Sequence, residues 1–385
     1  MTKVLKVNPD NPEFDAVLEA ARMIQTGGLV AFPTETVYGL GAHGLSATAV
    51  RRIFEAKRRP STDPLILHVA SPLEVEMLTT ASAMRVLERQ IDALSESFWP
   101  GALTLVLPRG SGVPLEVTGG GNTVAVRVPS HKVAQALIRA AGVPIAAPSA
   151  NLFSRPSPTS ASDVLEDLKD RVDMVLDGGS TEIGLESTVL DLTTSIPTLL
   201  RPGGVPLEEL ERVLGEVALP GEVVMDANSI APSPGMQLRH YAPRAKMVCL
   251  MGAVGMPLRA ALKKEADAIV ASGQRLGLLL CHSSMLSLDG INAERVNLGA
   301  CSNQWFIASQ LFTGLRALDR AGADVILTHG FADVGLGRAI NDRLYRASEG
   351  QVVQVEMITG RPGKSVTTPT VEDDLLRSSE GDLLG

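Results

Sequence analysis

Short apolar segments alternate with longer amphipathic segments along most of the chain. Runs such as Leu65–Val69 and Leu103–Leu107 have the length and composition typical of buried strands. Between such runs lie segments with the apolar spacing of helices, and Ser46 is a candidate N-cap for a helix that ends near Arg58. This alternation predicts an α/β fold.

The expected elements form two groups, separated by a stretch without a clear period. The expected strands lie at residues 29–32, 65–69, 103–107, 123–128, 143–147, 174–176, 188–192, 198–200, 247–251, 276–280 and 325–328. The expected helices lie at residues 14–26, 47–58, 82–98, 131–141, 160–169, 206–214, 257–272, 303–320 and 336–348.

The stretch between the two groups contains several prolines and few aliphatic side chains, which is typical of a linker. The end of the chain consists largely of small, polar and acidic residues, which is typical of a mobile tail. We therefore expect a first α/β domain over residues 1–214, a linker over 215–245, a smaller α/β domain over 246–357 and a tail over 358–385.

The composition narrows the class of protein. With 385 residues, 45% of them hydrophobic and 20% charged, the chain has the balance of a folded globular protein of two domains. Its net charge of −8 and its aromatic content of 3% argue against a surface that binds nucleic acid by base stacking. Since no segment resembles a membrane span or a secretory signal, we expect a cytoplasmic protein without membrane contact.

The cysteines suggest no site of their own. Cys249, Cys281 and Cys301 are widely spaced and match neither a disulfide framework nor a zinc-binding pattern. We expect all three to pack as thiols in a reducing compartment. The sequence therefore identifies no metal ligand in the protein.

The first segment that suggests chemistry is FPTETVYGLGAHGLS, residues 32–46. Its polar side chains follow a predicted strand, which favours a ligand pocket over a plain glycine-rich turn. The segment also contains the spacing G-x-G-x-x-G at Gly39, Gly41 and Gly44. In a dinucleotide-binding fold the first glycine directly follows the strand, whereas here five residues intervene, so a nicotinamide site fits poorly.

Cationic side chains suggest binding of anions, although each has a structural alternative. Lys57, Arg58 and Arg59 end a predicted helix, where they would either complement the helix dipole or clamp a polyphosphate. Arg127, in an otherwise apolar strand, is either exposed or aimed at a carboxylate. His68 is either a core histidine or part of a site.

Further polar segments follow predicted strands or lie in the linker. The run IAAPSANLFSRPSP (145–158) places hydroxyl and amide groups at a strand end, where open α/β sheets bind ligands. GLESTVLDL (184–192) and LLRPGG (199–204) follow. In the linker, the cluster of Arg239, His240 and Tyr241 suggests that this segment docks onto a cleft and excludes water as a lid.

Taken in order, seven segments resemble the threonylcarbamoyl-AMP synthase family. They are PTETVYGLG, AKRRP followed by PLILH, TVAVRVP, APSAN, ESTV, LLRPG and SPGMQLRHYAP, within residues 32–243. The resemblance implies a YrdC-like domain with a twisted, open α/β sheet, a linker, and a smaller Rossmann-like α/β accessory domain, as in the long form of the family.

The resemblance also implies a nucleotidyltransferase reaction. L-Threonine, bicarbonate or CO2, and ATP give threonylcarbamoyl-AMP, pyrophosphate and water. The product passes to the tRNA threonylcarbamoyl transferase machinery, which modifies adenosine 37 of ANN-decoding tRNAs to N6-threonylcarbamoyladenosine. Mg²⁺ is implied as the cofactor that accompanies ATP.

The family motifs assign residues to these substrates. The residues that match the L-threonine pocket are Thr34, His68, Arg127, Ala147 and Ser187. Those that match the ATP contacts are Lys57, Ser61, Thr123, Ser149, Ser157, Arg201 and Tyr241. Lys57 and Arg59 are the candidate catalytic residues, because they suit the charge on the phosphates, and Arg58, Asn151 and His240 are additional candidates.

Two other functions are consistent with parts of the sequence. The basic residues within 51–59 would suit an RNA-binding module without adenylyltransferase activity, although the net charge and the scarcity of aromatic residues argue against direct tRNA binding. YrdC-like domains also occur in carbamoyltransferases that use carbamoyl phosphate. Those proteins carry zinc-finger cysteines, which three scattered cysteines do not supply.

Overall fold

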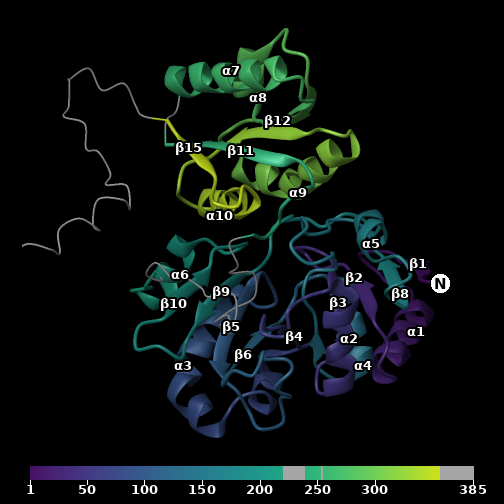
Figure 1. Ribbon diagram of the computed structural model, residues 1–385. Helices are drawn as coiled ribbons and strands as arrows, with labels where there is room; N and C mark the ends of the chain where they lie inside the picture. Colours follow the sequence, from purple (N-terminus) through teal and green to yellow (C-terminus); the bar gives the residue numbers. More distant parts are fainter. Residues whose placement is uncertain (220–238, 253–254, 356–385) are drawn as a thin grey trace, which may run out of the picture.

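The computed structural model describes residues 1–219, 239–252 and 255–355. Two sheets organise this part of the chain, and the two bodies lie one above the other in Figure 1. The body with the ten-stranded sheet and helices α1–α6 is called the N-terminal domain below. The body with the five-stranded sheet and helices α7–α10 is called the C-terminal domain.

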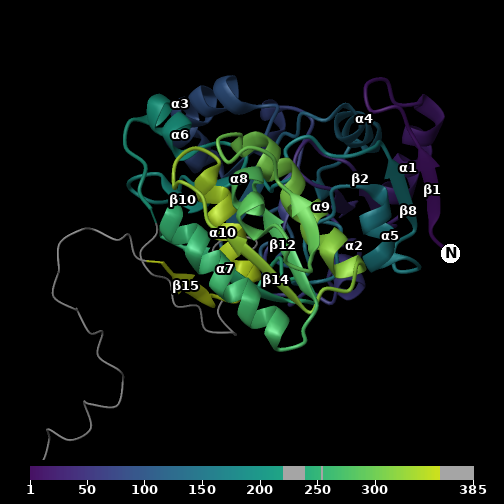
Figure 2. The same cartoon turned by 90° about the horizontal axis from the view of Figure 1, so that it is seen from above.

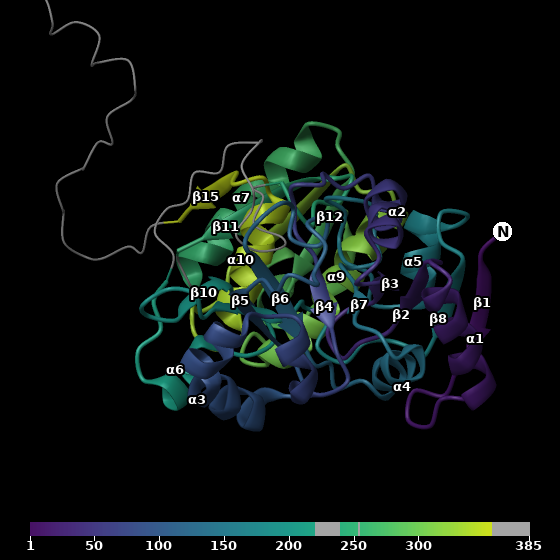
Figure 3. The same cartoon turned by 90° about the horizontal axis from the view of Figure 1, so that it is seen from below.

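The sheet of the N-terminal domain is mixed, with strand order β1-β8-β2-β3-β7-β4-β6-β5-β9-β10. Its strands are β1 (Lys3–Lys6), β2 (Val30–Phe32), β3 (Gly39–His43), β4 (Ile66–His68), β5 (Leu103–Pro108), β6 (Thr123–Arg127), β7 (Ile145–Ala146), β8 (Met174–Asp177), β9 (Thr188–Asp191) and β10 (Thr198–Arg201). Strands β4 and β6 run parallel, with His68 opposite Arg127. This register brings two candidate site residues side by side, on neighbouring strands that face the viewer in Figure 3.

Helices cover this sheet and bury two apolar clusters. The helices are α1 (Phe14–Gln25), α2 (Ala47–Lys57), η1 (Pro72–Met77), α3 (Ala81–Phe98), α4 (Lys132–Ala141), α5 (Ala161–Leu168) and α6 (Leu207–Leu214). Ser46 is the N-cap of α2, as predicted, because its side chain accepts from the amide of Ala49. The predicted α/β class and the twisted sheet with a second, smaller α/β domain are confirmed.

The C-terminal domain has an all-parallel sheet with order β13-β12-β14-β11-β15. Its elements are β11 (Lys246–Met251), α7 (Met256–Ala271), β12 (Leu276–Leu280), α8 (His282–Met285), η2 (Leu286–Leu288), β13 (Glu294–Asn297), α9 (Gln304–Arg320), β14 (Val325–His329), α10 (Gly337–Ala347) and β15 (Val352–Gln354). Figure 1 shows α7 and α8 on the outer face of the sheet, with α9 and α10 between the sheet and the N-terminal domain. The view from above in Figure 2 shows this domain lying over the N-terminal domain. Helices α9 and α10 therefore form the contact between the domains.

Four strands were not predicted, namely β1, β3, β13 and β15. Strand β3 contains Gly39 and Gly41, which were interpreted as part of a polar loop, and it pairs with β2 and β7. Most of the predicted linker and the whole predicted tail lie outside the described residues. None of the helices within the described ranges combines the length and apolar character that a membrane crossing requires.

The expectation for two cysteines was wrong. Cys281 and Cys301 form a disulfide, whereas Cys249 is a buried free thiol in β11. The two bonded residues follow β12 and β13, which are neighbours in the parallel sheet, so a separation of 20 residues in sequence becomes direct contact. Because the pairing depends on strand order, the spacing of the cysteines along the chain could not reveal it.

Candidate active site

A pocket lies in the N-terminal domain between several strand ends and the end of the linker. The described residues that line it are Thr34, Thr36, Val37, Gly39, Arg59, Ile66, His68, Arg127, Ala147, Pro148, Ser149, Glu186, Ser187, Arg201, His240 and Tyr241. They come from strand ends, from the loops that follow them and from the end of the linker. Most of these residues are polar or charged, and such groups fix the orientation of a bound ligand.

Arg127 enters the pocket from the end of β6 and is 3% exposed. Its Nη2 pairs with Oε1 of Glu35 at 2.6 Å, its Nη1 donates to the Thr36 hydroxyl at 2.9 Å, and its Nε donates to the Gly101 carbonyl at 3.1 Å. These contacts use three of the five guanidinium N–H groups. The remaining two N–H groups, one on each terminal nitrogen, have no partner in the described residues and can bind an anionic ligand.

Further hydroxyl groups line the same pocket and are held by hydrogen bonds within the protein. Thr34 Oγ1 lies 2.6 Å from the Val37 carbonyl and 2.7 Å from Thr36 Oγ1. Ser187 Oγ lies 2.7 Å from Thr104 Oγ1. Such hydroxyls are preorganised to bind a small polar ligand at little further cost in side-chain entropy.

Two more arginines add positive charge. Arg59 is 7% exposed, pairs with Asp63 at 2.7 Å and donates to the Pro64 carbonyl. Arg201, at the end of β10, donates through Nε and Nη2 to the Ser187 carbonyl at 3.1 and 2.9 Å. Three guanidinium groups at one pocket suit anionic ligands, although ion pairs with Asp63 and Glu35 offset the charges of Arg59 and Arg127.

Lys57 has a different position from the one expected of an ATP contact. It is buried under the loop after β7, where Nζ donates to the Ser149 carbonyl at 2.5 Å and to the Asn151 carbonyl at 2.6 Å. Burial lowers its pKa well below the ordinary value, and nearby Arg59 adds to this shift. Lys57 therefore fixes the loop after β7, and its contact with ATP stays a prediction.

The structure brings most of the predicted site residues together. All five predicted threonine residues line the pocket, as do Arg59, Ser149, Arg201, His240 and Tyr241. Those outside the lining are Lys57, Arg58, Ser61, Thr123, Asn151 and Ser157. Among these, Arg58 and Ser61 are exposed, and Thr123 lies at the opposite end of β6 from Arg127. Their proposed roles toward ATP remain predictions.

The two pocket histidines are uncharged in the folded protein. Burial lowers the pKa of His68 to about 3, and the charge of Arg127 acts in the same direction. Burial also lowers the pKa of His240 well below its usual value, with contributions from Arg59 and Lys57. Neutral imidazoles in these positions add no charge to the pocket and can accept hydrogen bonds.

The end of the linker closes one side of the pocket. Tyr241 is fully buried, and the His240 ring packs edge-on against it with 4.0 Å between the ring centres. Phe153 and Phe312 pack against this pair from the N-terminal and C-terminal domains, respectively. Burial raises the pKa of the Tyr241 hydroxyl to about 12. Arg239, in contrast, is largely exposed and pairs with Glu349.

Sequence reasoning missed two carboxylates in the site. Glu35 pairs with Arg127, and Glu186 lines the pocket beside Ser187. Both belong to motifs that were singled out, PTETVYGLG and ESTV, but no role was assigned to them. The signal available in the sequence was the presence of an acidic residue inside each polar motif, since a buried carboxylate requires a cationic or hydrogen-bonding partner.

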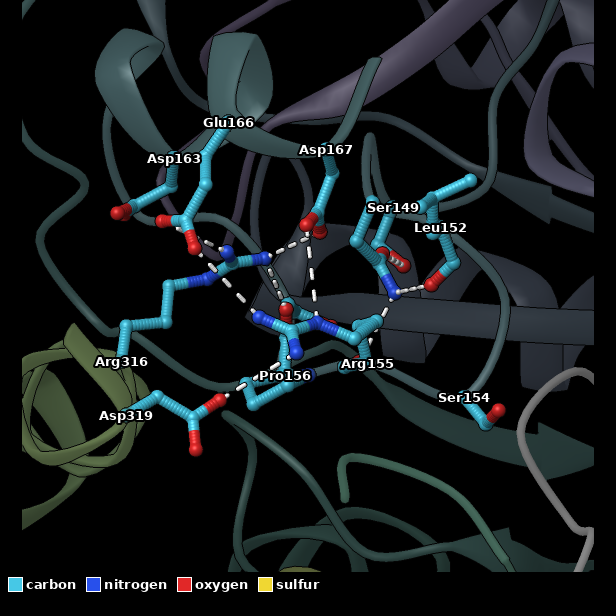
Figure 4. Close-up of polar contacts among 12 residues, drawn as sticks. Ser149, Leu152, Ser154, Arg155, Pro156, Asp163, Glu166, Asp167, Arg316 and Asp319 are labelled. Atoms are coloured by element: carbon cyan, nitrogen blue, oxygen red, sulfur yellow. Dashed lines mark hydrogen bonds and ion pairs between the residues drawn. The ribbon is translucent and has the colours of Figure 1, made fainter. Parts of the chain in front are cut away.

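An ion-pair network joins the loop between β7 and α5, residues 147–160, to the C-terminal domain (Figure 4). Arg316 of α9 donates to the Pro156 carbonyl at 2.6 Å and pairs with Asp167 at 2.7 Å. In the opposite direction, Arg155 reaches Asp319 of α9 at 3.3 Å. Arg316 and Asp167 are almost completely buried, so these contacts fix the loop before α5 against the C-terminal domain.

Known proteins share this architecture over nearly the whole chain. Residues 22–203 match the Sua5/YciO/YrdC family model, described as telomere recombination, and residues 205–349 match the model described as threonylcarbamoyl-AMP synthase, C-terminal domain. The threonylcarbamoyl-AMP synthase of Pyrococcus abyssi is 44% identical over 87% of this chain and 95% of its own length. That of Bacillus subtilis is 40% identical over 88% and 94%, respectively.

The fold of the chain is also similar to a solved structure. The crystal structure of P. abyssi Sua5 complexed with L-threonine matches with a TM-score of 0.85 and 43% identity, covering 92% of this chain and all of that chain. Both the sequence and the arrangement of the two domains are therefore shared with these relatives. The chain belongs to the threonylcarbamoyl-AMP synthase family, in the form that carries a C-terminal domain.

Proposed function

We propose that the pocket binds L-threonine and ATP together and forms threonylcarbamoyl-AMP, with bicarbonate or CO2 as the source of the carbamoyl carbon. The observation that carries this proposal is the surroundings of Arg127. Its two remaining N–H groups suit a carboxylate, and the fixed hydroxyls of Thr34 and Ser187 lie in the same pocket. Arg59 and Arg201 supply further positive charge for phosphates.

The proposed reaction needs positioning and charge neutralisation but no protein nucleophile. After its ammonium group loses a proton, the threonine amine attacks the carbon of CO2, and the nitrogen releases a second proton to solvent as the carbamate forms. Bicarbonate supplies the CO2 by taking up one proton and releasing water. A carbamate oxygen then attacks the α-phosphorus of ATP, and the bond from this phosphorus to the pyrophosphate oxygen breaks. Aligning these groups and stabilising the charge on the phosphates are tasks that buried guanidinium groups perform.

Mg²⁺ would enter this pocket as part of the nucleotide substrate. Glu186 lines the pocket and Glu35 contacts the pocket residue Arg127, and each of these carboxylates pairs with an arginine. Mg²⁺ is commonly held by phosphate oxygens and water with few protein ligands. We therefore assign the metal to the phosphates of ATP and its neutralising effect to the leaving pyrophosphate.

We further propose that the product is used in the cytoplasm to modify tRNA through the threonylcarbamoyl transferase machinery. Direct RNA binding by the basic stretch is disfavoured by its environment. Lys57 and Arg59 are buried, Arg51 pairs with Glu116, and Arg52 pairs with Asp173. These residues do not form the exposed basic stripe that a phosphate backbone requires.

Replacement of Tyr241 by alanine is expected to raise the KM for ATP about 10-fold and to uncouple ATP cleavage from product formation. The ring closes one side of the pocket, so its removal admits water to a labile carbamate and mixed anhydride. The measurement compares pyrophosphate with threonylcarbamoyl-AMP formed per ATP. Unchanged kinetics and unchanged stoichiometry would contradict the role of the linker as a lid.

The decisive experiment measures pyrophosphate release from Mg²⁺-ATP by the purified protein, with threonine and bicarbonate each omitted in turn. Release that requires both supports the proposed reaction. ATP cleavage that does not depend on threonine, or the absence of any cleavage, would overturn it. In that case, tRNA binding measured at several salt concentrations would test the RNA-binding alternative, which predicts a steep decrease in affinity with salt.

A further inference from the structure

The C-terminal domain reaches the pocket wall through one buried arginine. Arg343, on α10, is fully buried, and its Nε donates to Oε2 of Glu186 at 2.8 Å. Glu186 belongs to the N-terminal domain and lines the pocket. Its other oxygen, Oε1, accepts from the hydroxyl of Ser157. One chain of polar contacts therefore runs from the C-terminal domain to a carboxylate in the proposed active site.

The position of Arg343 is fixed from two other directions. Its Nη1 pairs with Asp342 at 2.6 Å, and Asp342 also accepts from Arg346. Its guanidinium carbon lies 5.0 Å from the centre of the Tyr241 ring, close enough for a cation–π contact. Arg343 thus contacts both the carboxylate and the aromatic side chain that line the same pocket.

Apolar side chains also join the pocket wall of the N-terminal domain to the C-terminal domain. Val37 and Leu185 of the N-terminal domain, together with Tyr241, belong to the apolar cluster that includes Leu311 and Phe312 of α9. Gly184 lies so close to α9 that an added Cβ would come within 2.6 Å of the Ser309 backbone. The segment that carries Glu186 is therefore packed into the core of the C-terminal domain.

The ion pair of Arg343 with Glu186 affects the charge that a bound nucleotide would meet. A carboxylate beside a site for ATP repels the phosphates, and the repulsion is strong where water is largely excluded. L-Threonine, a zwitterion with no net charge, is much less affected. Arg343 is the cation that forms an ion pair with Glu186 within the described part of the chain. Its removal would leave Glu186 with the Ser157 hydroxyl as its hydrogen-bonding side chain, and with Arg201 of the same pocket acting on it only through space.

We propose that Arg343 is a positioning residue of the nucleotide pocket, and that supplying its charge to Glu186 is a function of the C-terminal domain. Arg343 acts through Glu186 and Tyr241 and is not placed to touch substrate itself. The inference rests on the proposed binding of ATP at this site. It gives the C-terminal domain a direct part in the reaction of the N-terminal domain.

The test uses the full-length Arg343→Met variant and measures the Kd for ATP by calorimetry and the KM for both substrates. We expect the affinity for ATP to decrease about 30-fold and that for threonine to change by less than about 3-fold. Arg343→Lys should recover part of the loss, because it keeps the charge without the guanidinium geometry. The matched control is Arg338→Met on the same helix, since Arg338 pairs with Asp333 within the C-terminal domain.

The double variant Arg343→Met/Glu186→Gln separates positioning from a general loss of structure. Without the carboxylate there is no charge to neutralise, so the double variant should bind ATP within about 3-fold of the Glu186→Gln single variant. Equal losses for both substrates without this recovery, or unchanged ATP affinity in Arg343→Met, would overturn the inference. If Arg343→Met does not fold, Arg343→Gln, which also removes the charge, replaces it in the same cycle with the same expected result. Wild-type protein that binds no ATP would instead overturn the proposed function.

Discussion

Replacing Arg127 by alanine is expected to weaken L-threonine binding at least about 30-fold while changing ATP affinity by less than about 3-fold. Arg127 is 3% exposed, and its two remaining N–H groups are the proposed fork for the threonine carboxylate. Loss of a buried, charge-assisted contact of this kind typically costs roughly 2–5 kcal/mol. The measurement is the Kd for each substrate by calorimetry, combined with the two KM values for pyrophosphate release.

The control for Arg127→Ala tests whether the loss of threonine binding comes from an unpaired Glu35. Removal of Arg127 leaves a buried carboxylate without its cationic partner, which destabilises the protein independently of substrate binding. The double variant Arg127→Ala/Glu35→Gln removes that charge, so it should recover thermal stability but not threonine affinity. Recovery of threonine binding in the double variant, or equal losses for both substrates in the single variant, would show that Arg127 does not recognise threonine.

Features that depend on neighbouring residues could be predicted from the sequence. The N-cap at Ser46 and most helices needed only local spacing, and the structure has them within a residue or two of the expected bounds. Polar motifs that follow strands lie near one another in the structure, because strand ends in an α/β sheet gather their loops. Local chemistry was therefore sufficient to find the region of the pocket.

Strand β3 was missed for a physical reason. Its glycines suggested a turn, but an added Cβ at Gly41 would lie 2.7 Å from the Phe32 ring and 2.8 Å from the Ile145 side chain. The glycine is therefore explained by close packing inside the sheet. A period-based analysis cannot distinguish a glycine that permits a turn from one that makes room for a neighbouring strand.

Partners that are distant in sequence could not be predicted from one chain. Glu186 and Arg343 are separated by 157 positions and lie in different domains. Nothing near either residue identifies the other, although a buried carboxylate implies that some partner exists. For the same reason, two other pairings could not be predicted, namely the ion pair of Glu35 with Arg127 and the disulfide of Cys281 with Cys301. The order of strands and loops brings each pair together.

Stability is expected to decrease as the pH falls from 7.5 to 5.5, by roughly 3 kcal/mol from His68 and His240 together. Burial depresses the pKa of both residues in the folded state, to about 3 for His68, whereas an unfolded imidazole has a pKa of about 6.5. Below pH 6.5 the unfolded chain therefore binds protons that the folded protein does not accept. The contribution of the two histidines to stability is therefore fully present above pH 6.5. It is lost as the pH falls toward their pKa values in the folded state.

The variant His240→Phe provides the matched comparison for this pH dependence. Phenylalanine keeps an aromatic ring beside Tyr241 and Phe153 but cannot be protonated in the unfolded state. The loss of stability between pH 7.5 and 5.5 that is attributed to His68 and His240 should be about half as large in this variant. Burial also lowers the pKa values of His131 and His329, so these residues add a loss of the same sign in the wild type and in the variant. Carboxyl groups in unfolded chains take up protons mainly below pH 4.3, so the window from 7.5 to 5.5 isolates the imidazoles. Urea denaturation at the two pH values measures the difference, and equal stability at both would show that the pocket histidines are protonated in the folded protein.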